Sequence, residues 1–168
     1  MTQKTRILVA VAVLVVLVAV VLGVDALRRV SSPVPVVEGE STLPPGSVPV
    51  YLDGRLVGGF SPTDLEQLEK MSFTDAEEGK TQEGWPLRDV LLLHVDRDKL
   101  QANSLITVSS SSRNKSAQLT WVEVNEPTNM VLFDLSGRGT LKLVSVLERL
   151  DTRDEWVQDV DSIEIVSP

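Results

Sequence analysis

The chain has 168 residues, no cysteine and one histidine, and its 16 basic and 24 acidic side chains give a net charge of −8. Without cysteine it can form no disulfide, hold no metal through a thiolate and use no cysteine nucleophile. Residues 1–32 hold four of the Lys and Arg and one of the Asp and Glu, so the rest hold 12 and 23 and carry −11. The negative charge of residues 33–168 argues against binding to nucleic acid or anionic lipid, because their phosphates would be repelled. It fits a soluble outer domain or one that docks a basic partner.

The amino-terminal region contains an unbroken apolar run, Ile7 to Val24. Eighteen residues at a helical rise of about 1.5 Å extend about 27 Å, close to the hydrocarbon thickness of a bilayer. The run predicts a single-pass membrane helix within residues 7–27, after a short cytoplasmic head of residues 1–6. A cleavable signal peptide is the alternative, because Val24 and Ala26 are small residues where a cleavage site would lie.

The residues that flank this run favour a retained anchor. Asp25, Arg28 and Arg29 follow it and resemble a stop at a membrane surface. The short head favours an amino terminus in the cytoplasm, which places the large domain in the periplasm or at the cell surface. Ala19 and Gly23 have the spacing that lets two membrane helices approach closely, although a run rich in Val and Ala gives such pairs by chance.

Residues 28–49 predict a tether. This stretch contains five of the nine prolines, at positions 33, 35, 44, 45 and 49. Proline favours extended polyproline geometry at about 3.1 Å per residue, so the tether could hold the following domain some tens of Å from the membrane. Part of it could instead lie along a partner.

The domain of residues 50–168 begins with a predicted β-hairpin over residues 50–57. Its turn is Asp53-Gly54, a dipeptide that accepts the positive φ angles of a tight hairpin. A helix is predicted next, with Ser61 as N-cap, Pro62 at its first position and Asp64 completing a capping box.

This first helix is expected to bury one apolar stripe, formed by Leu65, Leu68 and Met71. Its acidic residues are interpreted as a solvated face; they are Asp64, Glu66 and Glu69. Residues 71–83 predict a loop or a poorly formed edge strand. Within it Glu77 and Glu78 are adjacent and lack the spacing of calcium ligands.

A second helix is predicted from Pro86, with a buried face of Leu87, Val90 and Leu91. His94 closes this helix. As a catalytic base it would need an orienting carboxylate and a nucleophile, and as a metal ligand it would need carboxylate companions. We interpret it as a helix-end histidine near the C-terminal dipole.

Strands follow at residues 105–108 and 117–121, where apolar and polar residues alternate. The polar turn between them, Ser109–Lys115, has hydroxyls, backbone N–H groups and two cations that could bind an anion. A hairpin tip of the same composition is ordinary, and we prefer that interpretation. Asn114-Lys115-Ser116 is also a glycosylation sequon, relevant only in a host that glycosylates secreted proteins.

The remaining segments predict three more strands, at residues 130–133, 140–146 and 162–166. Residues 154–160 are expected to form a short helical turn that directs Trp156, Val157 and Val160 inward. The expected fold class is therefore α+β: a single-pass N-terminal transmembrane helix followed by one mixed, β-rich domain with about six strands, two good helices and no repeats.

The order of several short motifs resembles the molybdopterin-binding domain of the sulfite oxidase family. The motifs run in family order across residues 51–166; they are Ser61–Leu68, Gly84–Leu91, Met130–Phe133, Leu141–Val144 and Trp156–Ile165. The resemblance implies the fold of that domain.

Departures from the family pattern bear on function. Enzymes of that family hold molybdenum through a cysteine thiolate, which this chain lacks. The family's Asp-Gly-Tyr turn is replaced by Ser109–Arg113, and its Gly-Pro before the basic strand by Gly139-Thr140. Pterin phosphate is normally met by several Arg, Lys and His, of which this domain has few. The resemblance therefore implies a fold without a catalyst, and we assign no catalytic, cofactor-binding or metal-binding residue.

Two classes of function fit these features. The first is a non-catalytic, membrane-anchored accessory subunit or binding module that docks other subunits of a respiratory or photosynthetic type of membrane assembly. The second is an enzyme, either a molybdopterin-binding oxidoreductase-like protein with unusual ligation or a hydrolase built on carboxylates and serines. An enzyme needs polar groups that converge in one pocket, whereas a subunit needs an exposed apolar or acidic patch. We expect the non-catalytic, membrane-anchored subunit or binding module.

Overall fold

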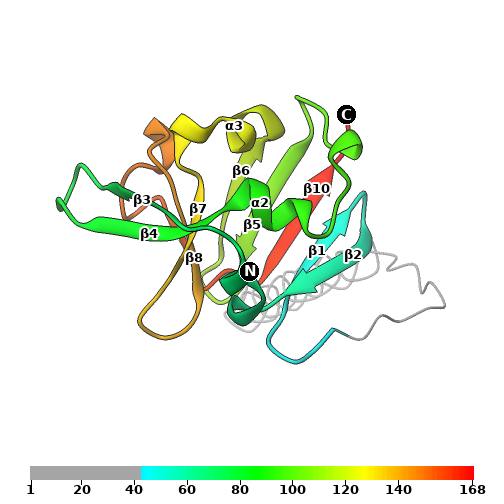
Figure 1. Ribbon diagram of the computed structural model, residues 1–168, viewed down its shortest axis with the longest axis horizontal. Coiled ribbons are helices and arrows are strands. Elements are labelled where there is room, and N and C mark those ends of the chain that lie inside the picture. The colour runs from blue at the N-terminus through cyan, green and yellow to red at the C-terminus, as the bar shows by residue number, and fades with distance from the viewer. Residues whose placement is uncertain (1–42) are drawn as a thin grey trace, which may run out of the picture. The chain divides into compact units, whose positions relative to one another are not determined.

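The structure is a computed structural model that describes residues 43–168, and these residues form two five-stranded sheets (Figure 1). The predicted head, the predicted membrane helix of residues 7–27 and the tether up to residue 42 lie outside the described residues. Within residues 43–168, no helix is long and apolar enough to cross a membrane. The prediction of a mixed, β-rich α+β domain with a few short helices is confirmed.

The first sheet has the strand order β2-β1-β10-β5-β6. Its strands are β1 (Val48–Leu52), β2 (Arg55–Phe60), β5 (Leu105–Ser110), β6 (Lys115–Thr120) and β10 (Ser162–Val166). The pairing of β1 with β10 is parallel, which brings the beginning and the end of the domain together at the centre of this sheet. The other pairings in this sheet are antiparallel, so β2 and β6 form its two edges.

The second sheet is antiparallel and has the order β3-β4-β7-β8-β9. Its strands are β3 (Met71–Thr74), β4 (Thr81–Pro86), β7 (Leu132–Leu135), β8 (Leu141–Val144) and β9 (Val157–Gln158). Two short α-helices, α2 (Leu87–Leu92) and α3 (Trp121–Asn125), accompany the sheets. Four 3-10 helices complete the described part, at Pro62–Gln67, Arg97–Lys99, Pro127–Asn129 and Glu148–Leu150.

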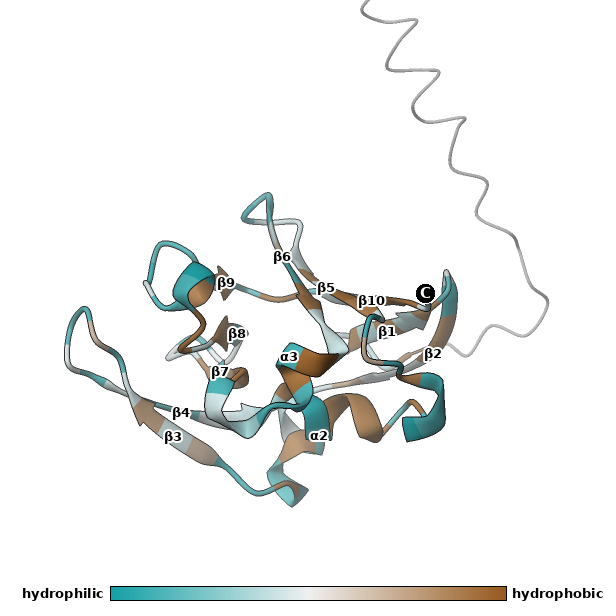
Figure 2. Cartoon of the chain, turned by 90° about the horizontal axis from the view of Figure 1, so that it is seen from above, coloured by the Kyte–Doolittle hydropathy of each residue, from teal (hydrophilic) through white to brown (hydrophobic). Residues whose placement is uncertain are grey.

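The sheets and α2 share one main core. In two views α2 lies between the first sheet and the β3–β4 hairpin, and the hairpin tips are hydrophilic (Figure 2). The largest fully buried side chains of this core are Phe60, Phe133, Leu65, Leu87, Leu91, Ile106, Leu119, Leu141, Leu143, Ile163 and Ile165. Burying one such side chain contributes about 1.5–3 kcal/mol, so this core is the main source of stability.

A second, smaller apolar cluster is formed by Leu132, Val144 and Trp156, with Met71 and Phe73 packed against it. It draws on strands of the second sheet whose other side chains point into the main core. Alternation along β7 and β8 explains this division, because neighbouring residues on a strand point to opposite faces.

The local turn and cap predictions are confirmed. Asp53 and Gly54 have φ angles of 50° and 76° and join β1 to β2. The capping box also forms, since the Asp64 carboxylate accepts hydrogen bonds from Ser61 N at 2.7 Å and Ser61 Oγ at 2.8 Å. The helix that it caps is a 3-10 helix that ends at Gln67, so Met71 belongs to β3 and not to the predicted helical stripe.

Three other element predictions are wrong in part. Residues 81–83 begin β4 instead of closing a loop, although β3 is an edge strand as expected. Trp121 starts α3 rather than ending a strand, because Thr120 and Glu123 form a capping box there. The segment 154–160 contains β9 in place of a helical turn, yet its apolar residues are buried as predicted: Trp156, Val157 and Val160.

A glycine packed against the neighbouring backbone gives a sharp test of the second sheet. A Cβ at Gly84 would overlap the carbonyl oxygen of Phe133, which cannot move without breaking the β4–β7 pairing. We therefore expect Gly84→Ala to lower the free energy of unfolding by about 3 kcal/mol or more. A Cβ at Gly137 would meet no atom within 4 Å, so Gly137→Ala should change stability by about 0.5 kcal/mol or less. Urea unfolding of both variants checks this; equal stabilities would contradict the close approach.

Candidate functional site

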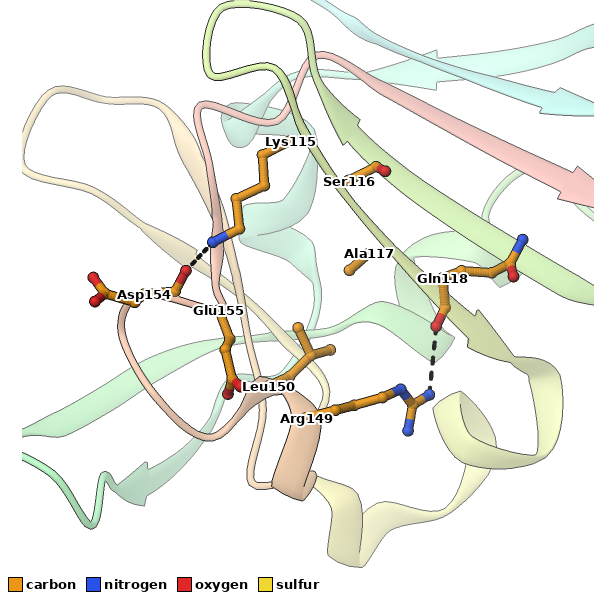
Figure 3. A pocket seen from close by; sticks show the side chains of 8 residues that line it. All are labelled: Lys115, Ser116, Ala117, Gln118, Arg149, Leu150, Asp154 and Glu155. Carbon is orange, nitrogen blue, oxygen red and sulfur yellow. Dashed lines mark hydrogen bonds between the residues drawn. The ribbon is translucent and has the colours of Figure 1, made fainter.

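The most developed hollow in the described part lies along β6. One wall is β6 itself and the other is the segment from Arg149 to Glu155, which leads into β9 (Figure 3). The hollow has a volume of about 370 Å³. Its lining residues are Lys115, Ser116, Ala117, Gln118, Arg149, Leu150, Asp154 and Glu155. We call it the β6 groove.

The groove borders a free strand edge. Trp121 N donates to Ser104 O at 2.9 Å, which makes these two residues a hydrogen-bonded pair at the end of the β5–β6 ladder. Hydrogen-bonded and non-hydrogen-bonded pairs alternate in antiparallel sheets, so the backbone groups of Ser116 and Gln118 point away from β5. The direction is confirmed at Gln118, whose carbonyl accepts a hydrogen bond from Arg149 across the groove at 3.4 Å.

The opposite wall is held in place by buried and charged contacts. The indole Nε1 of Trp156 donates to Leu150 O at 2.9 Å. Arg153 N donates to Glu77 at 3.0 Å, and the Arg153 guanidinium contacts Glu78 at 3.3 Å. These contacts fix both ends of the segment, so the groove is preformed.

Two long side chains cross the groove, one near each end (Figure 3). Lys115 Nζ donates to the carbonyl oxygen of Asp154, and Arg149 reaches Gln118 O. Arg149 also pairs with Glu123 at 2.7 Å, and this hydrogen bond, with two from Thr120, lowers the pKa of Glu123 to about 2. The contact with Gln118 is long and its donor is half exposed, so breaking it costs about 0–1 kcal/mol.

A second hollow of about 260 Å³ adjoins the groove at the serine-rich turn and is lined by Ser109, Ser110, Ser111, Asn114, Lys115 and Ser116. Two of the donors that could have bound an anion here are engaged by carboxylates of the same chain. Ser111 N donates to Asp161 at 2.7 Å, and Arg113 Nε donates to Asp159 at 2.6 Å. Asn114 is exposed at the tip with a φ of 49°, so the sequon is accessible.

Asp159 joins the turns of both sheets. Its carboxylate accepts hydrogen bonds from Arg113 in the β5–β6 turn, from Arg138 in the β7–β8 turn at 2.9 Å, and from Thr140 Oγ1 at 2.7 Å. The Thr140 hydroxyl and then Arg113 lower the pKa of Asp159. No sequence motif had singled out Asp159, because its partners are 19 to 46 residues away.

His94 was expected to close α2, but the helix ends at Leu92 with Leu93 as its cap, and His94 lies in the turn that follows. His94 N donates to Leu91 O at 3.0 Å, and the ring stacks on Phe60 with centroids 5.9 Å apart. Its buried Nε2 has no hydrogen-bond partner among the described residues. Burial lowers the pKa of His94 below its ordinary value of 6.5, and the Asp64 carboxylate opposes this only in part. In residues 43–168, His94 belongs to no group of three His, Asp or Glu side chains that could hold a metal ion.

The other acidic candidates are engaged or dispersed. Glu78 pairs with Lys80 at 2.7 Å and with Arg153, and Asp64 serves the capping box. Glu66 and Glu69 are exposed, as predicted for a solvated face. In residues 43–168, no three His, Asp or Glu side chains are grouped as a metal site would require.

The residues do not fit a molybdopterin. The sequence offers no thiolate for the metal. Five of the seven arginines in residues 43–168 are paired with carboxylates instead of being free to meet a pterin phosphate; the pairs are Arg88 with Asp89, Arg113 and Arg138 with Asp159, Arg149 with Glu123, and Arg153 with Glu78. We therefore derive no chemistry from that cofactor.

Comparison with known proteins adds no family: no protein-family model and no curated protein matches the chain.

Stability should depend on pH through His94. The folded state holds His94 at a lowered pKa, so the unfolded chain takes up its proton first as the pH falls. Stability should be constant above about pH 6.5 and decline below it, towards the folded pKa. The measurement is urea unfolding at pH 7.5 and 5.5. His94→Gln should remove most of the difference, because the chain has no other histidine. The same loss in both proteins would exclude His94 as its source.

The carboxylate of Asp159 should stabilise the domain. Asp159→Asn keeps a side chain that tolerates the φ of 56° but removes the charge shared by Arg113 and Arg138. We expect a loss of about 1–3 kcal/mol in the free energy of unfolding. Asp96→Asn is the control, because Asp96 makes one exposed contact of 3.5 Å with Lys99 and should matter little. Urea unfolding compares them, and equal losses would refute the role of Asp159.

Proposed function

We propose that this chain is a non-catalytic accessory subunit or binding module, anchored in a membrane by residues 7–27 and working by docking a partner in the β6 groove. The proposal places the domain outside the cytoplasm, within a membrane assembly of respiratory or photosynthetic type. It also takes the order of the sulfite-oxidase-like motifs as a sign of descent from a cofactor-binding domain that no longer holds its cofactor.

The β6 groove is the observation that carries this proposal. It combines a preformed hollow of about 370 Å³ with a strand edge whose backbone groups face it. Its floor is apolar at Ala117 and Leu150, and its rim is charged at Lys115, Arg149 and Asp154. An apolar floor with a polar rim is the usual anatomy of a protein interface.

The distribution of charge also supports binding rather than catalysis. A catalytic site needs titratable groups that converge on one position with their proton-transfer capacity available. In the described residues the strongest charge clusters pair acid with base, as at Asp159 and Glu123. The groove itself holds no histidine and no nucleophile beside a base within hydrogen-bonding distance.

A bulky substitution in the groove tests the proposal. Ser116 is exposed and lines both hollows, so Ser116→Trp should place a bulky side chain at the strand edge and obstruct docking without disturbing the core. Ser72→Trp is a matched control, because Ser72 is an exposed serine on another edge strand, β3. Full-length tagged proteins are purified from the native membrane in mild detergent and the co-purified proteins are quantified by mass spectrometry. We expect Ser116→Trp to lose at least ten-fold of a stoichiometric partner that wild type and Ser72→Trp retain.

Two results would overturn the proposal. If the wild-type protein purifies alone and carries molybdenum, pterin or another metal, the protein is not a simple binding module. If Ser116→Trp retains its partner at the wild-type level, docking takes place elsewhere on the surface. Unchanged urea unfolding of both variants is required, so that loss of the partner is not loss of the fold.

A further inference from the structure

The manner of docking follows from the edge of β6. We propose that the β6 groove accepts an extended segment of a partner polypeptide, which adds to the first sheet as a new edge strand beside β6. This inference rests on the proposed function and specifies the chemistry of the partner. The hydrogen-bonding capacity and the floor of the groove support it, as does the charge of the domain.

Hydrogen-bonding capacity is supplied by Ser116 and Gln118. Their N–H and C=O groups point into the groove, whereas Ala117 and Leu119 direct theirs to β5. An added strand therefore finds two donors and two acceptors at the spacing of a β-ladder. Thr120 does not extend this row, because its N–H donates to the Glu123 carboxylate at 2.8 Å. The new pairing should span residues 115–119.

Two side-chain bridges cross the groove, and an added strand would have to displace them. Lys115 bridges the walls at one end with one hydrogen bond, and Arg149 bridges them at the other (Figure 3). Both come from exposed or half-exposed side chains, which can swing aside when a strand enters.

β6 lacks the usual protection of an edge strand. Natural sheets guard their edges with proline, β-bulges or inward-pointing charges. β6 contains no proline, and its six pairs with β5 run without a register shift. Lys115 is its one charged residue and crosses the groove near its end. Lys115 and the segment Arg149–Glu155 give partial cover, and the Gln118 carbonyl becomes available for pairing once Arg149 moves aside.

The floor and the charges define the occupant. The residue of the added strand opposite Ala117 would point to the same face as Ala117, towards the buried Leu150, so it should be small and apolar. Its neighbours would lie on the outer face of the sheet. The lining itself balances Lys115 and Arg149 against Asp154 and Glu155, so the net charge of −11 after residue 32 is what favours basic residues there. The occupant is thus an extended, basic segment with a central apolar residue.

A proline substitution separates backbone pairing from side-chain contact. Gln118→Pro removes the N–H that faces the groove, at an edge position where proline does not break the β5–β6 ladder. Gln118→Ala removes the side chain and keeps that N–H. Full-length wild type and both variants are purified from the native membrane as before. We expect Gln118→Pro to lose at least ten-fold of the partner and Gln118→Ala to retain it.

Hydrogen exchange gives a readout that needs no variant. The amides of Ser116 and Gln118 should exchange at least ten-fold more slowly in the native assembly than in the isolated full-length chain. The amides of Ala117 and Leu119 pair with β5 in both states and serve as the internal reference. This measurement decides the question even if Gln118→Pro fails to fold.

The possible outcomes separate the two proposals. A partner retained by Gln118→Pro, with no protection of Ser116 and Gln118, overturns strand addition and leaves the binding-module function intact. A wild-type chain that purifies without a partner overturns both. Protection that appears in the isolated chain as its concentration rises means that a second copy occupies the edge, and this overturns the partner segment.

Discussion

The chain crosses from the second sheet to the first within three residues, and the contacts of this crossover hold the candidate site in position. β9 ends at Gln158 and β10 begins at Ser162. Between them, Asp159 binds arginines from two hairpin turns and Asp161 binds the serine-rich turn that leads into β6. The segment that forms the far wall of the groove leads directly into β9. Both walls are therefore fixed to the same crossover, so their separation is a property of the fold.

Elements set by neighbouring residues could be predicted from the sequence. The Asp53-Gly54 turn and the Ser61 cap depend on contacts within three residues, and both form as expected. The same kind of local signal, a capping box from Thr120 to Glu123, explains why Trp121 begins a helix although the apolar alternation of β6 continues through it. In contrast, Val157 pairs with Leu143, and no pattern within residues 154–160 could indicate that this short stretch becomes a strand.

The groove could not have been predicted, because it is made by two segments about thirty residues apart that share no motif. No sequence motif marks Arg149 or Asp154 as lining a groove. They line it because Trp156 packs against Leu132 and Val144 of the second sheet, and its indole donates to Leu150 O in their segment. The composition of the serine-rich turn allowed anion binding as the less favoured interpretation, beside an ordinary hairpin tip. The structure adds what the composition could not give: two of its donors, Ser111 N and Arg113 Nε, bond to Asp161 and Asp159 of the same chain.

This internal pairing has a consequence for function. Arg113, Arg138 and Arg149 are neutralised by carboxylates of the same chain, so these three arginines offer little free positive charge with which to bind phosphate. Each contact joins segments distant in the chain, so the domain itself holds its turns and the groove wall in place. Backbone amides, such as those at the edge of β6, recognise the extended conformation of another chain rather than a particular small molecule, and they gain affinity when both walls are already in place. Under the proposed strand addition, charge pairing within the domain would therefore reduce the ordering that binding requires.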